Sequence, residues 1–218
     1  MTIFCLGRNH PALRPASAGG RAEAPGEADS LLVASKADSA LSGPRDPIPL
    51  LPVHRQVDWE AELVLRIGRP AFQLRDPEQA RAVISHWGVG NDITDRWWQT
   101  LGGGQWLKGK SFPGFAPHAL APDPPDFNLE RRVRCWLNGE LVQDAWLRDY
   151  LHPPAAVVQQ LSRFTRLLPG DLVFCGSFPG MGFQRQPPRF LAAGDQLDTE
   201  IEGLGRLENP VRTVSPEG

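Results

Sequence analysis

The sequence lacks several features that would assign the protein to a specialised class. Its 23 Lys and Arg residues are balanced by 25 Asp and Glu residues, so it has no basic excess that would attract nucleic acid. No stretch approaches the roughly 18 consecutive apolar residues of a membrane-spanning helix. The opening MTIFCLGRNHP has neither the basic start nor the apolar stretch of a secretory signal. We therefore expect a cytoplasmic protein that binds neither nucleic acid nor membranes.

Cysteine is also scarce, and the three cysteines lack the spacing of a metal site. Cys5, Cys135 and Cys175 each lie within an apolar run, and no CxxC pair occurs. This pattern favours buried, reduced thiols. Glycine and proline are abundant, with 22 of each, beside 41% hydrophobic residues. This composition predicts a loop-rich and strand-rich fold with a sizeable core.

The first quarter of the chain differs in composition from the rest. Residues 11–30 are mostly Pro, Ala, Gly, Ser and Glu, with too few large apolar side chains to offset the entropy of ordering. The short runs LLVASK and PIPLLP follow, and the prolines there exclude a central strand or a continuing helix. We predict that residues 1–57 form an arm or lid with edge strands, and that residues 58–218 form the main domain.

Alternating patterns predict strands through the main domain. DWEAELVLRIG, residues 58–68, places Glu60 and Glu62 on one face of a strand. RRVRCWLNGELVQDAWL predicts two strands joined at Asn138-Gly139, the strongest short hairpin signal. Further strands are expected at residues 87–91, 171–178 and 195–205.

Helical spacing is found in three segments. We predict a short helix within residues 76–86, a second helix that begins near Thr94, and an amphipathic helix over residues 155–168. Residues 106–122 are rich in Gly and Pro, which favours an extended loop of the kind that lines active sites.

Three carboxylates are candidates for a metal site. Glu60 and Glu62 are two residues apart on a strand, so their side chains leave the same face about 6 to 7 Å apart. Asp92 ends the apolar stretch GVGND, where an unpaired acid would be costly to bury. A divalent cation with oxygen ligands, such as Mg²⁺, would relieve the repulsion among these groups. The alternatives are a solvated strand face for the two glutamates and a helix N-cap for Asp92.

Lys110 is a candidate for electrostatic stabilisation. It lies in KGKSFPGF, where glycines allow close approach to a ligand, and an ammonium there could stabilise an enolate or bind a carboxylate. The alternative is a solvated lysine.

A series of short motifs, taken together, resembles the fumarylacetoacetate hydrolase family. In chain order these are GRN at residues 7–9, DWEAEL with Glu60 and Glu62, GNDITDRWWQ with Asp92, GKSF with Lys110, NGELVQ with Gln143, LLPGDLVFCGSFPGMG with Ser177, and the closing GDQLDTEIEGLGRLENPV. Each motif alone is weak, but the series covers nearly the whole chain.

The resemblance implies an α+β fold, a β-rich mixed roll with peripheral helices, in which residues 58–218 are the metal-binding catalytic part. It implies a Mg²⁺ or Mn²⁺ ion held by Glu60, Glu62 and Asp92, and usually a homodimer. Substrates of the family are small 2-oxo acids and β-dicarbonyl acids, which members hydrolyse at a carbon-carbon bond, decarboxylate or isomerise. The cation would stabilise an enolate, with Lys110 as a second positive charge. The resemblance also implies that the substrate is bound by Arg8, Gln143 and Ser177.

The sequence departs from the family pattern at the expected water-activating base. Many members carry a His and a Glu on a lid helix after GRN, and here those positions hold Leu13 and Ala16. His10 is one candidate replacement, Glu23 and Glu27 in the arm are others, and a packing role for His10 is the alternative. Phe178 replaces a usual proline and is expected to narrow the site. Three tryptophans, Trp97, Trp98 and Trp106, form either an apolar wall near the metal or part of the core.

The leading hypothesis from the sequence is a Mg²⁺-dependent hydrolase that cleaves a carbon-carbon bond in an acylpyruvate-like acid. A metal-dependent keto-enol tautomerase or an oxaloacetate-type decarboxylase needs no attacking water, so the missing His-Glu pair adds weight to those reactions. A non-catalytic ligand-binding relative is a further alternative.

Overall fold

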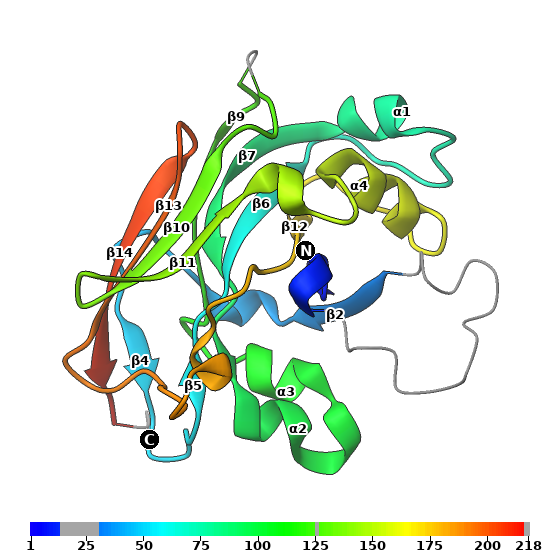
Figure 1. Cartoon of the computed structure of the whole chain (residues 1–218). Helices are drawn as coiled ribbons and strands as arrows, with labels where there is room; N and C mark the ends of the chain where they lie inside the picture. Colours follow the sequence, from blue (N-terminus) through cyan, green and yellow to red (C-terminus); the bar gives the residue numbers. More distant parts are fainter. Residues whose placement is uncertain (14–30, 125–126, 216–218) are drawn as a thin grey trace, which may run out of the picture.

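Two β-sheets pack against each other in the computed structural model, which describes residues 1–13, 31–124 and 127–215 (Figure 1). The larger sheet has seven strands in the order β2-β1-β12-β6-β7-β9-β3. Its strands are β1 (Ile3–Gly7), β2 (Leu32–Lys36), β3 (Leu41–Ser42), β6 (Ala61–Ile67), β7 (Ile84–Asn91), β9 (Ala116–Pro122) and β12 (Leu172–Phe174).

The second sheet covers one face of the first. Its five strands are, in spatial order, β11 (Glu140–Trp146), β10 (Arg132–Leu137), β13 (Gln196–Ile201), β14 (Gly205–Thr213) and β4 (Ile48–Leu50). A separate pair joins β5 (Val57–Asp58) and β8 (Thr94–Asp95). Contacts of β13 and β14 with β6, β7 and β9 enclose a common core that includes Leu63, Val133 and Leu207. The predicted α+β class, a β-rich mixed roll, is confirmed.

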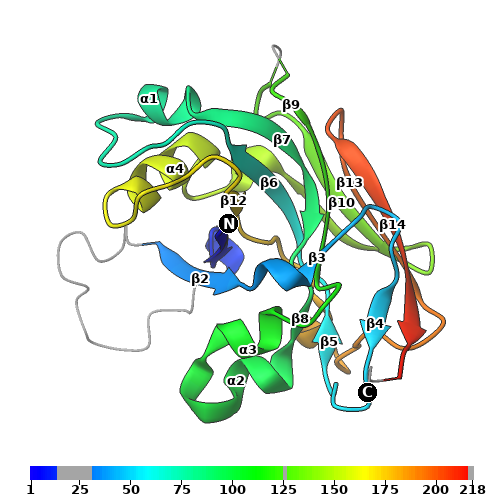
Figure 2. The same ribbon diagram turned by 180° about the vertical axis from the view of Figure 1, so that it is seen from behind.

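The helices lie at the periphery, in two groups. The described helices are α1 (Pro77–Arg81), α2 (Arg96–Gly104), α3 (Trp106–Lys110) and α4 (Pro154–Ser162), with 3₁₀ turns η1 (Pro11–Leu13), η2 (Asp38–Ala40), η3 (Leu147–Asp149) and η4 (Gly182–Gln184). Helices α1 and α4 contact each other, while α2 and α3 pair on the opposite side, next to β8 and β2 (Figure 2). None of the described helices is long and apolar enough to span a bilayer.

Two local predictions are confirmed in detail. The strand predicted at residues 58–68 is β6, which pairs antiparallel with both β12 and β7. It is buried on both faces, as expected for an inner strand with a sheet or helices on each side. The hairpin of β10 and β11 turns at Asn138 and Gly139, whose φ angles of 53° and 82° match the left-handed turn that this dipeptide favours.

Both the first and the last predicted helices are shorter than their sequence patterns. Helix α1 begins after its N-cap Asp76 but stops at Arg81, because the chain enters β7 at Ile84. Helix α4 stops at Ser162, not at residue 168. The chain is extended at Leu167, which exchanges two backbone hydrogen bonds with Ala71 at 2.9 and 3.0 Å. Tertiary pairing therefore overrides helical periodicity in both places.

The predicted extended loop at residues 106–122 was wrong over most of its length. Residues Trp106–Lys110 form α3, and Ala116–Pro122 form β9. Strand β9 accommodates its prolines because it pairs with β7 along one side and meets the short β3 only at Ala116 and Pro117. The first helix of this region starts at Arg96, close to the predicted position.

Residues 1–57 contribute both inner and edge strands. Strand β1 lies between β2 and β12, whereas β2, β3 and β4 are edge strands, as the runs LLVASK and PIPLLP predicted for β2 and β4. Residues 14–30 of the predicted arm, with Ala16, Glu23 and Glu27, lie outside the described residues, and the boundary at residue 57 stays a prediction. All three cysteines are buried and free, as expected.

Candidate metal centre and active site

The three predicted acids meet at one end of the β6–β7 pair. Glu62 lies in β6, Glu60 precedes that strand, and Asp92 follows β7. The backbone N–H of Asp92 donates to the Glu60 carbonyl at 2.8 Å, which holds the two ends together. One carboxylate oxygen from each acid lies within 4.8 Å of the others, and all three residues are buried. We call Glu60, Glu62 and Asp92 the acid cluster.

Three cations surround the acid cluster. Lys110, at the end of α3, places its Nζ 3.1 Å from Glu60 Oε2 and in an ion pair with Asp92 Oδ2. Arg96, at the start of α2, pairs with Glu60 Oε1 and also with Asp58, at 2.8 Å from its Oδ2. Lys36 Nζ lies 2.7 Å from Asp92 Oδ1. The alternatives of solvated acids and a solvated Lys110 are therefore excluded.

Glu62 is the least compensated member of the cluster. Its Oε2 accepts a hydrogen bond from the Gly176 N–H at 2.7 Å, while its Oε1 is buried without a hydrogen-bond partner. Burial raises the pKa of Glu62 well above its usual range, and the charges of Asp92 and Glu60 act in the same direction. A buried carboxylate oxygen without a partner costs free energy, and a hard divalent cation would satisfy it. The oxygen-only donor set of the cluster therefore fits Mg²⁺ or Mn²⁺.

Asp92 and Lys110 are both held in their charged forms. Burial would raise the pKa of Asp92, but the charges of Lys110 and Lys36 outweigh it and leave this pKa below its ordinary value. Burial would likewise lower the pKa of Lys110, but Asp92 and Glu60 raise it above the usual range. Asp92 does not cap α2, because Asp95 does, accepting from the N–H groups of Trp97 and Trp98. The Asp92 carboxylate is thus paired with Lys36 and Lys110 and takes no part in capping a helix.

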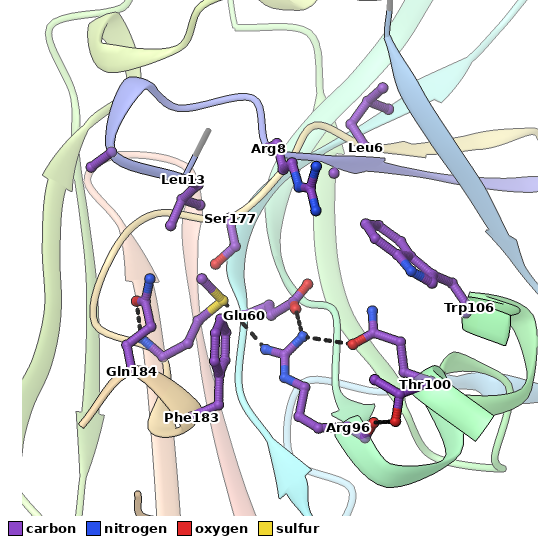
Figure 3. A pocket seen from close by; sticks show the side chains of 15 residues that line it. Leu6, Arg8, Leu13, Glu60, Arg96, Thr100, Trp106, Ser177, Phe183 and Gln184 are labelled. Atoms are coloured by element: carbon purple, nitrogen blue, oxygen red, sulfur yellow. Dashed lines mark hydrogen bonds and ion pairs between the residues drawn. The ribbon is translucent and has the colours of Figure 1, made fainter. Parts of the chain in front are cut away.

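A pocket of about 430 Å³ opens beside the acid cluster (Figure 3). Glu60 and Arg96 belong to both, and they connect the pocket with the buried acids. The other lining residues come from β1 and the turn after it, from α2 and α3, and from the 177–184 loop: Leu6, Gly7, Arg8, Ala12, Leu13, Gln99, Thr100, Gly104, Trp106, Ser177, Met181, Phe183 and Gln184. The pocket thus joins one acidic corner to a largely apolar wall.

Two of the predicted substrate-binding residues line this pocket. The side chain of Arg8 points into it (Figure 3), and Arg8 forms no ion pair with the described residues. The backbone of Arg8 is left-handed, with φ 56°, a conformation that is uncommon outside glycine and typical of functional turns. Ser177 also lines the pocket, and its hydroxyl accepts from Gln143 Nε2 at 3.1 Å.

Gln143 lies behind Ser177 and does not line the pocket. Its Oε1 accepts from the Ala61 N–H at 3.0 Å, and its Nε2 donates to the Phe178 carbonyl at 2.6 Å as well as to Ser177. The buried amide therefore connects β11 with the start of β6 and the 177–184 loop. The predicted substrate contact of Gln143 stays a prediction, since the structure shows its amide engaged with the protein.

His10 lies near the pocket without lining it. Its Nδ1 accepts the Ala12 N–H at 3.1 Å, and its ring packs edge-on against Phe178 at 5.9 Å between centroids. Burial lowers the pKa of His10, so the imidazole is neutral at pH 7. With Nδ1 occupied as an acceptor, the neutral ring carries its proton on Nε2. The predicted role of His10 as a base is untested, and this arrangement offers a donor in its place.

The aromatic residues are arranged differently from the expectation. Phe178 is fully buried and stacks against Tyr150 at 4.7 Å, so it does not narrow the pocket as predicted. Of the three tryptophans, only Trp106 lines the pocket, and Lys110 Nζ lies 5.9 Å from its ring centroid. Gly7 allows this packing, because a Cβ there would lie 2.6 Å from the Trp106 ring.

Sequence reasoning left two contributors out of the site. Arg96 could have been included, because it lies in GNDITDRWWQ beside Asp92. Lys36 gave no signal, since a lysine at the end of LLVASK is indistinguishable from a solvated residue at a strand end.

Comparisons with known proteins agree with the fold. The family model described as fumarylacetoacetate (FAA) hydrolase C-terminal matches residues 2–212, so the chain belongs to this family. A mitochondrial oxaloacetate tautomerase of Xenopus laevis is 36% identical over 83% of this chain and 57% of its own length. A fumarylacetoacetate hydrolase domain-containing protein of Dictyostelium discoideum is 38% identical over 83% of this chain and 63% of its own. The chain thus spans about six-tenths of the length of these curated relatives.

Solved structures with isomerase and hydrolase names share the fold. A probable 2-hydroxyhepta-2,4-diene-1,7-dioate isomerase of Mycobacterium abscessus superposes with a TM-score of 0.85 at 29% identity, covering 99% of this chain and 76% of the other. The fumarylacetoacetate hydrolase of Exiguobacterium antarcticum gives 0.84 at 30% identity, covering 98% and 75%. The family assignment from the sequence is confirmed. The names of these relatives include two reaction types, isomerisation and hydrolysis. Because several curated relatives are named as mitochondrial, the expected cytoplasmic location stays a prediction.

Proposed function

We propose that this protein is a divalent-cation-dependent keto-enol tautomerase that acts on a small 2-oxo acid of the oxaloacetate type. The observation that carries the proposal is the acid cluster, in which the unpartnered Glu62 Oε1 lies among three buried carboxylates at the side of a pocket. We place tautomerisation ahead of hydrolysis, the leading hypothesis from the sequence, because the described lining residues of the pocket include charged groups but no free base. The names of the curated relatives support the same order.

The acid cluster would hold Mg²⁺ or Mn²⁺ through one oxygen from each residue. Such a cation, when bound, supplies positive charge that lowers the free energy of an enolate. Lys110 adds a protonated ammonium beside Glu60 and Asp92, because its raised pKa keeps it charged. It can therefore donate a hydrogen bond to an enolate oxygen.

Arg8 and Ser177 would orient the substrate from the other side of the pocket. The Arg8 guanidinium can bind a carboxylate with two parallel hydrogen bonds. The Ser177 hydroxyl accepts from Gln143, and its own proton reaches only the Phe178 carbonyl at a long 3.4 Å. That proton is therefore the donor that Ser177 can offer to a substrate oxygen.

The bond changes of tautomerisation suit this pocket. In ketonisation the enol oxygen releases its proton to solvent water, its electron pair forms the C=O bond, and the electrons of the C=C bond take up a proton from solvent at carbon. One proton leaves and one is gained, so no water molecule is consumed. Hydrolysis needs a base that deprotonates an attacking water. Among the described lining residues, Glu60 is the one carboxylate, and both of its oxygens are paired with Arg96 and Lys110.

The test follows the enol absorbance of oxaloacetate with purified protein, in Mn²⁺, in Mg²⁺ or in EDTA. We expect cation-dependent loss of the enol without release of pyruvate. Lys110→Met should reduce the rate at least about 100-fold if Lys110 stabilises the enolate, by analogy with the removal of an oxyanion donor. Lys108→Met is the matched control and should leave the rate unchanged, because the Lys108 ammonium donates to the Leu101 carbonyl at 2.8 Å and lies outside the acid cluster.

Other products would identify other reactions. Pyruvate and CO₂ from oxaloacetate would show a decarboxylase. Pyruvate and a carboxylic acid from an acylpyruvate would show the carbon-carbon hydrolase, and a replacement base would then have to be sought in His10 or the arm. Binding of the enol without turnover would favour a non-catalytic relative. The predicted homodimer is tested by analytical ultracentrifugation of the same sample.

A further inference from the structure

Lys36 is a buried cation for which the proposed reaction has no direct use. It is the last residue of β2, and its side chain is completely shielded from solvent. Its Nζ donates to the carbonyl oxygens of Ile93 at 2.9 Å, Lys110 at 2.6 Å and Phe115 at 2.8 Å. Asp92 Oδ1 lies 2.7 Å from Nζ as an ion-pair partner, without a hydrogen bond. The three carbonyl acceptors match the three N–H donors of the ammonium form.

These partners connect the segments that carry the charged residues of the site. The Ile93 carbonyl follows Asp92 directly, the Lys110 carbonyl belongs to the proposed stabilising lysine, and Phe115 precedes β9. A single ammonium thus fixes the end of β7 against the end of α3. Breaking this arrangement would move Asp92 and Lys110 relative to each other.

The contact with Asp92 separates the two oxygens of that carboxylate. Oδ1 lies in an ion pair with the buried ammonium of Lys36, while Oδ2 pairs with Lys110, and one of the two oxygens lies within 4.8 Å of a carboxylate oxygen from each glutamate. We propose that Lys36 is a positioning residue, which fixes the Asp92 carboxylate so that Oδ2 alone is presented to the divalent cation. This proposal rests on the cation of the proposed function.

Electrostatics alone predicts the opposite effect of removing Lys36. A positive charge beside a carboxylate ligand repels an incoming cation, so a role through charge alone would make the uncharged variant bind the cation more tightly. A purely structural role would lower the stability of the fold and leave the affinity of the folded protein unchanged. Positioning predicts weaker binding, because partners that orient metal ligands are typically worth about 10- to 100-fold in affinity.

The experiment measures Mn²⁺ affinity of the full chain by isothermal titration calorimetry, at a temperature where circular dichroism shows each variant folded. We expect Lys36→Met to weaken Mn²⁺ binding about 10- to 100-fold. Lys36→Arg should weaken it as well, because a guanidinium keeps the charge but cannot place one nitrogen among four oxygens. Lys108→Met, which removes a lysine outside the cluster, should bind Mn²⁺ like the unmodified protein.

Each outcome bears on a different claim. Unchanged or tighter Mn²⁺ binding by Lys36→Met would overturn the positioning role, as would normal affinity in Lys36→Arg. If the unmodified protein binds no Mn²⁺, the cation of the proposed function falls first, and the role of Lys36 toward it falls with it. Should both variants fail to fold, a crystal structure of the unmodified protein with Mn²⁺ decides. We expect Lys36 Nζ on Asp92 Oδ1 and Mn²⁺ on Oδ2, and a Mn²⁺ ion on Oδ1 would overturn the proposal.

Discussion

Acids and bases pair in two very different settings in this protein. Around the acid cluster, Lys36 and Lys110 contact Asp92 with side chains that are at most 2% exposed. On the five-stranded sheet a second set of pairs is partly open to water, and Arg206, which contacts Asp198 and Glu200, is 44% exposed. We call this set the sheet ladder, and it also includes Arg132, Arg134 and Asp144.

The difference in burial decides what each set of charges can do. Water and salt screen the pairs of the sheet ladder, so each contributes about 0 to 1 kcal/mol. In the acid cluster, desolvation makes every charge expensive and every partner necessary. The same desolvation shifts pKa values and strengthens electrostatic stabilisation of a substrate. Ion pairs between the same types of residue therefore have little energetic effect on the five-stranded sheet, whereas at the end of the β6–β7 pair they form a candidate reaction centre.

The largest expected effect follows from removing the shared counterion. Asp92→Asn leaves the ammonium groups of Lys36 and Lys110 buried beside a neutral amide. We expect a loss of about 3 to 5 kcal/mol in the free energy of unfolding, as for other broken buried pairs. Urea denaturation in EDTA at pH 7 measures it. The matched change in the sheet ladder is Asp144→Asn, which breaks the Arg132 pair and should cost at most about 1 kcal/mol. Equal costs for the two variants would contradict the contrast.

Asp195 is an intermediate case that adds a pH dependence. Burial would raise its pKa, but hydrogen bonds from Asn138, the Ala192 N–H and Arg189 leave the pKa of Asp195 below its ordinary value of 3.8. A lowered pKa in the folded state stabilises the protein above the unfolded value, and this stability is lost as the pH falls through the folded value.

We expect Asp195→Asn to cost about 1.5 to 3 kcal/mol at pH 7, the worth of a hydrogen bond to a charged group. The cost should shrink as the pH is lowered below 3.8, because the carboxyl of the unmodified protein then becomes protonated as well. Urea denaturation of both proteins from pH 7 to pH 3 measures the difference. A cost that stays constant across this range would show that the charge of Asp195 contributes nothing.

Local patterns in the sequence were sufficient for the elements that depend on short-range rules. The hairpin at Asn138-Gly139 and the strand after Glu60 follow from turn chemistry and from alternation. Strand β9 was missed because its prolines argue against a strand. They are tolerated because β9 pairs with β3 over only two residues, so most of that side of the strand needs no backbone N–H donors. Helix α4 was overextended because the pairing of residue 167 with residue 71 is a long-range contact.

The site shows the same division between local and tertiary information. The acid cluster was predictable, because strand spacing and the family resemblance pointed to the same carboxylates. The burial of Lys36 was not, since it depends on carbonyl groups that lie 57 to 79 residues away in the sequence. A lysine is exposed in most proteins, and no local pattern distinguishes the exception. Whether another side chain replaces the missing His-Glu pair likewise depends on which side chains reach the pocket, and this is tertiary information.

The smallest expected change in stability lies inside the acid cluster itself. Glu62 has a raised pKa, caused by burial and then by Asp92 and Glu60, so its negative charge costs free energy at neutral pH when no cation is bound. Glu62→Gln removes that charge, keeps an oxygen for the Gly176 N–H, and places an amide donor where Oε1 has no partner. We expect the free energy of unfolding in EDTA to stay within about 1 kcal/mol of the unmodified protein or to rise.

The same variant should lose the stabilisation by Mn²⁺ that the unmodified protein shows, because a ligand that binds only the folded state raises its stability in proportion to RT ln(1 + [L]/Kd). Thermal unfolding with EDTA or with Mn²⁺ separates the two effects. A strong loss of stability in EDTA would mean that the ionised carboxylate of Glu62 is well compensated by the protein. Its unpartnered oxygen would then no longer argue for a cation. The buried charges around Asp92 would then be a structural network like the sheet ladder, but shielded from solvent.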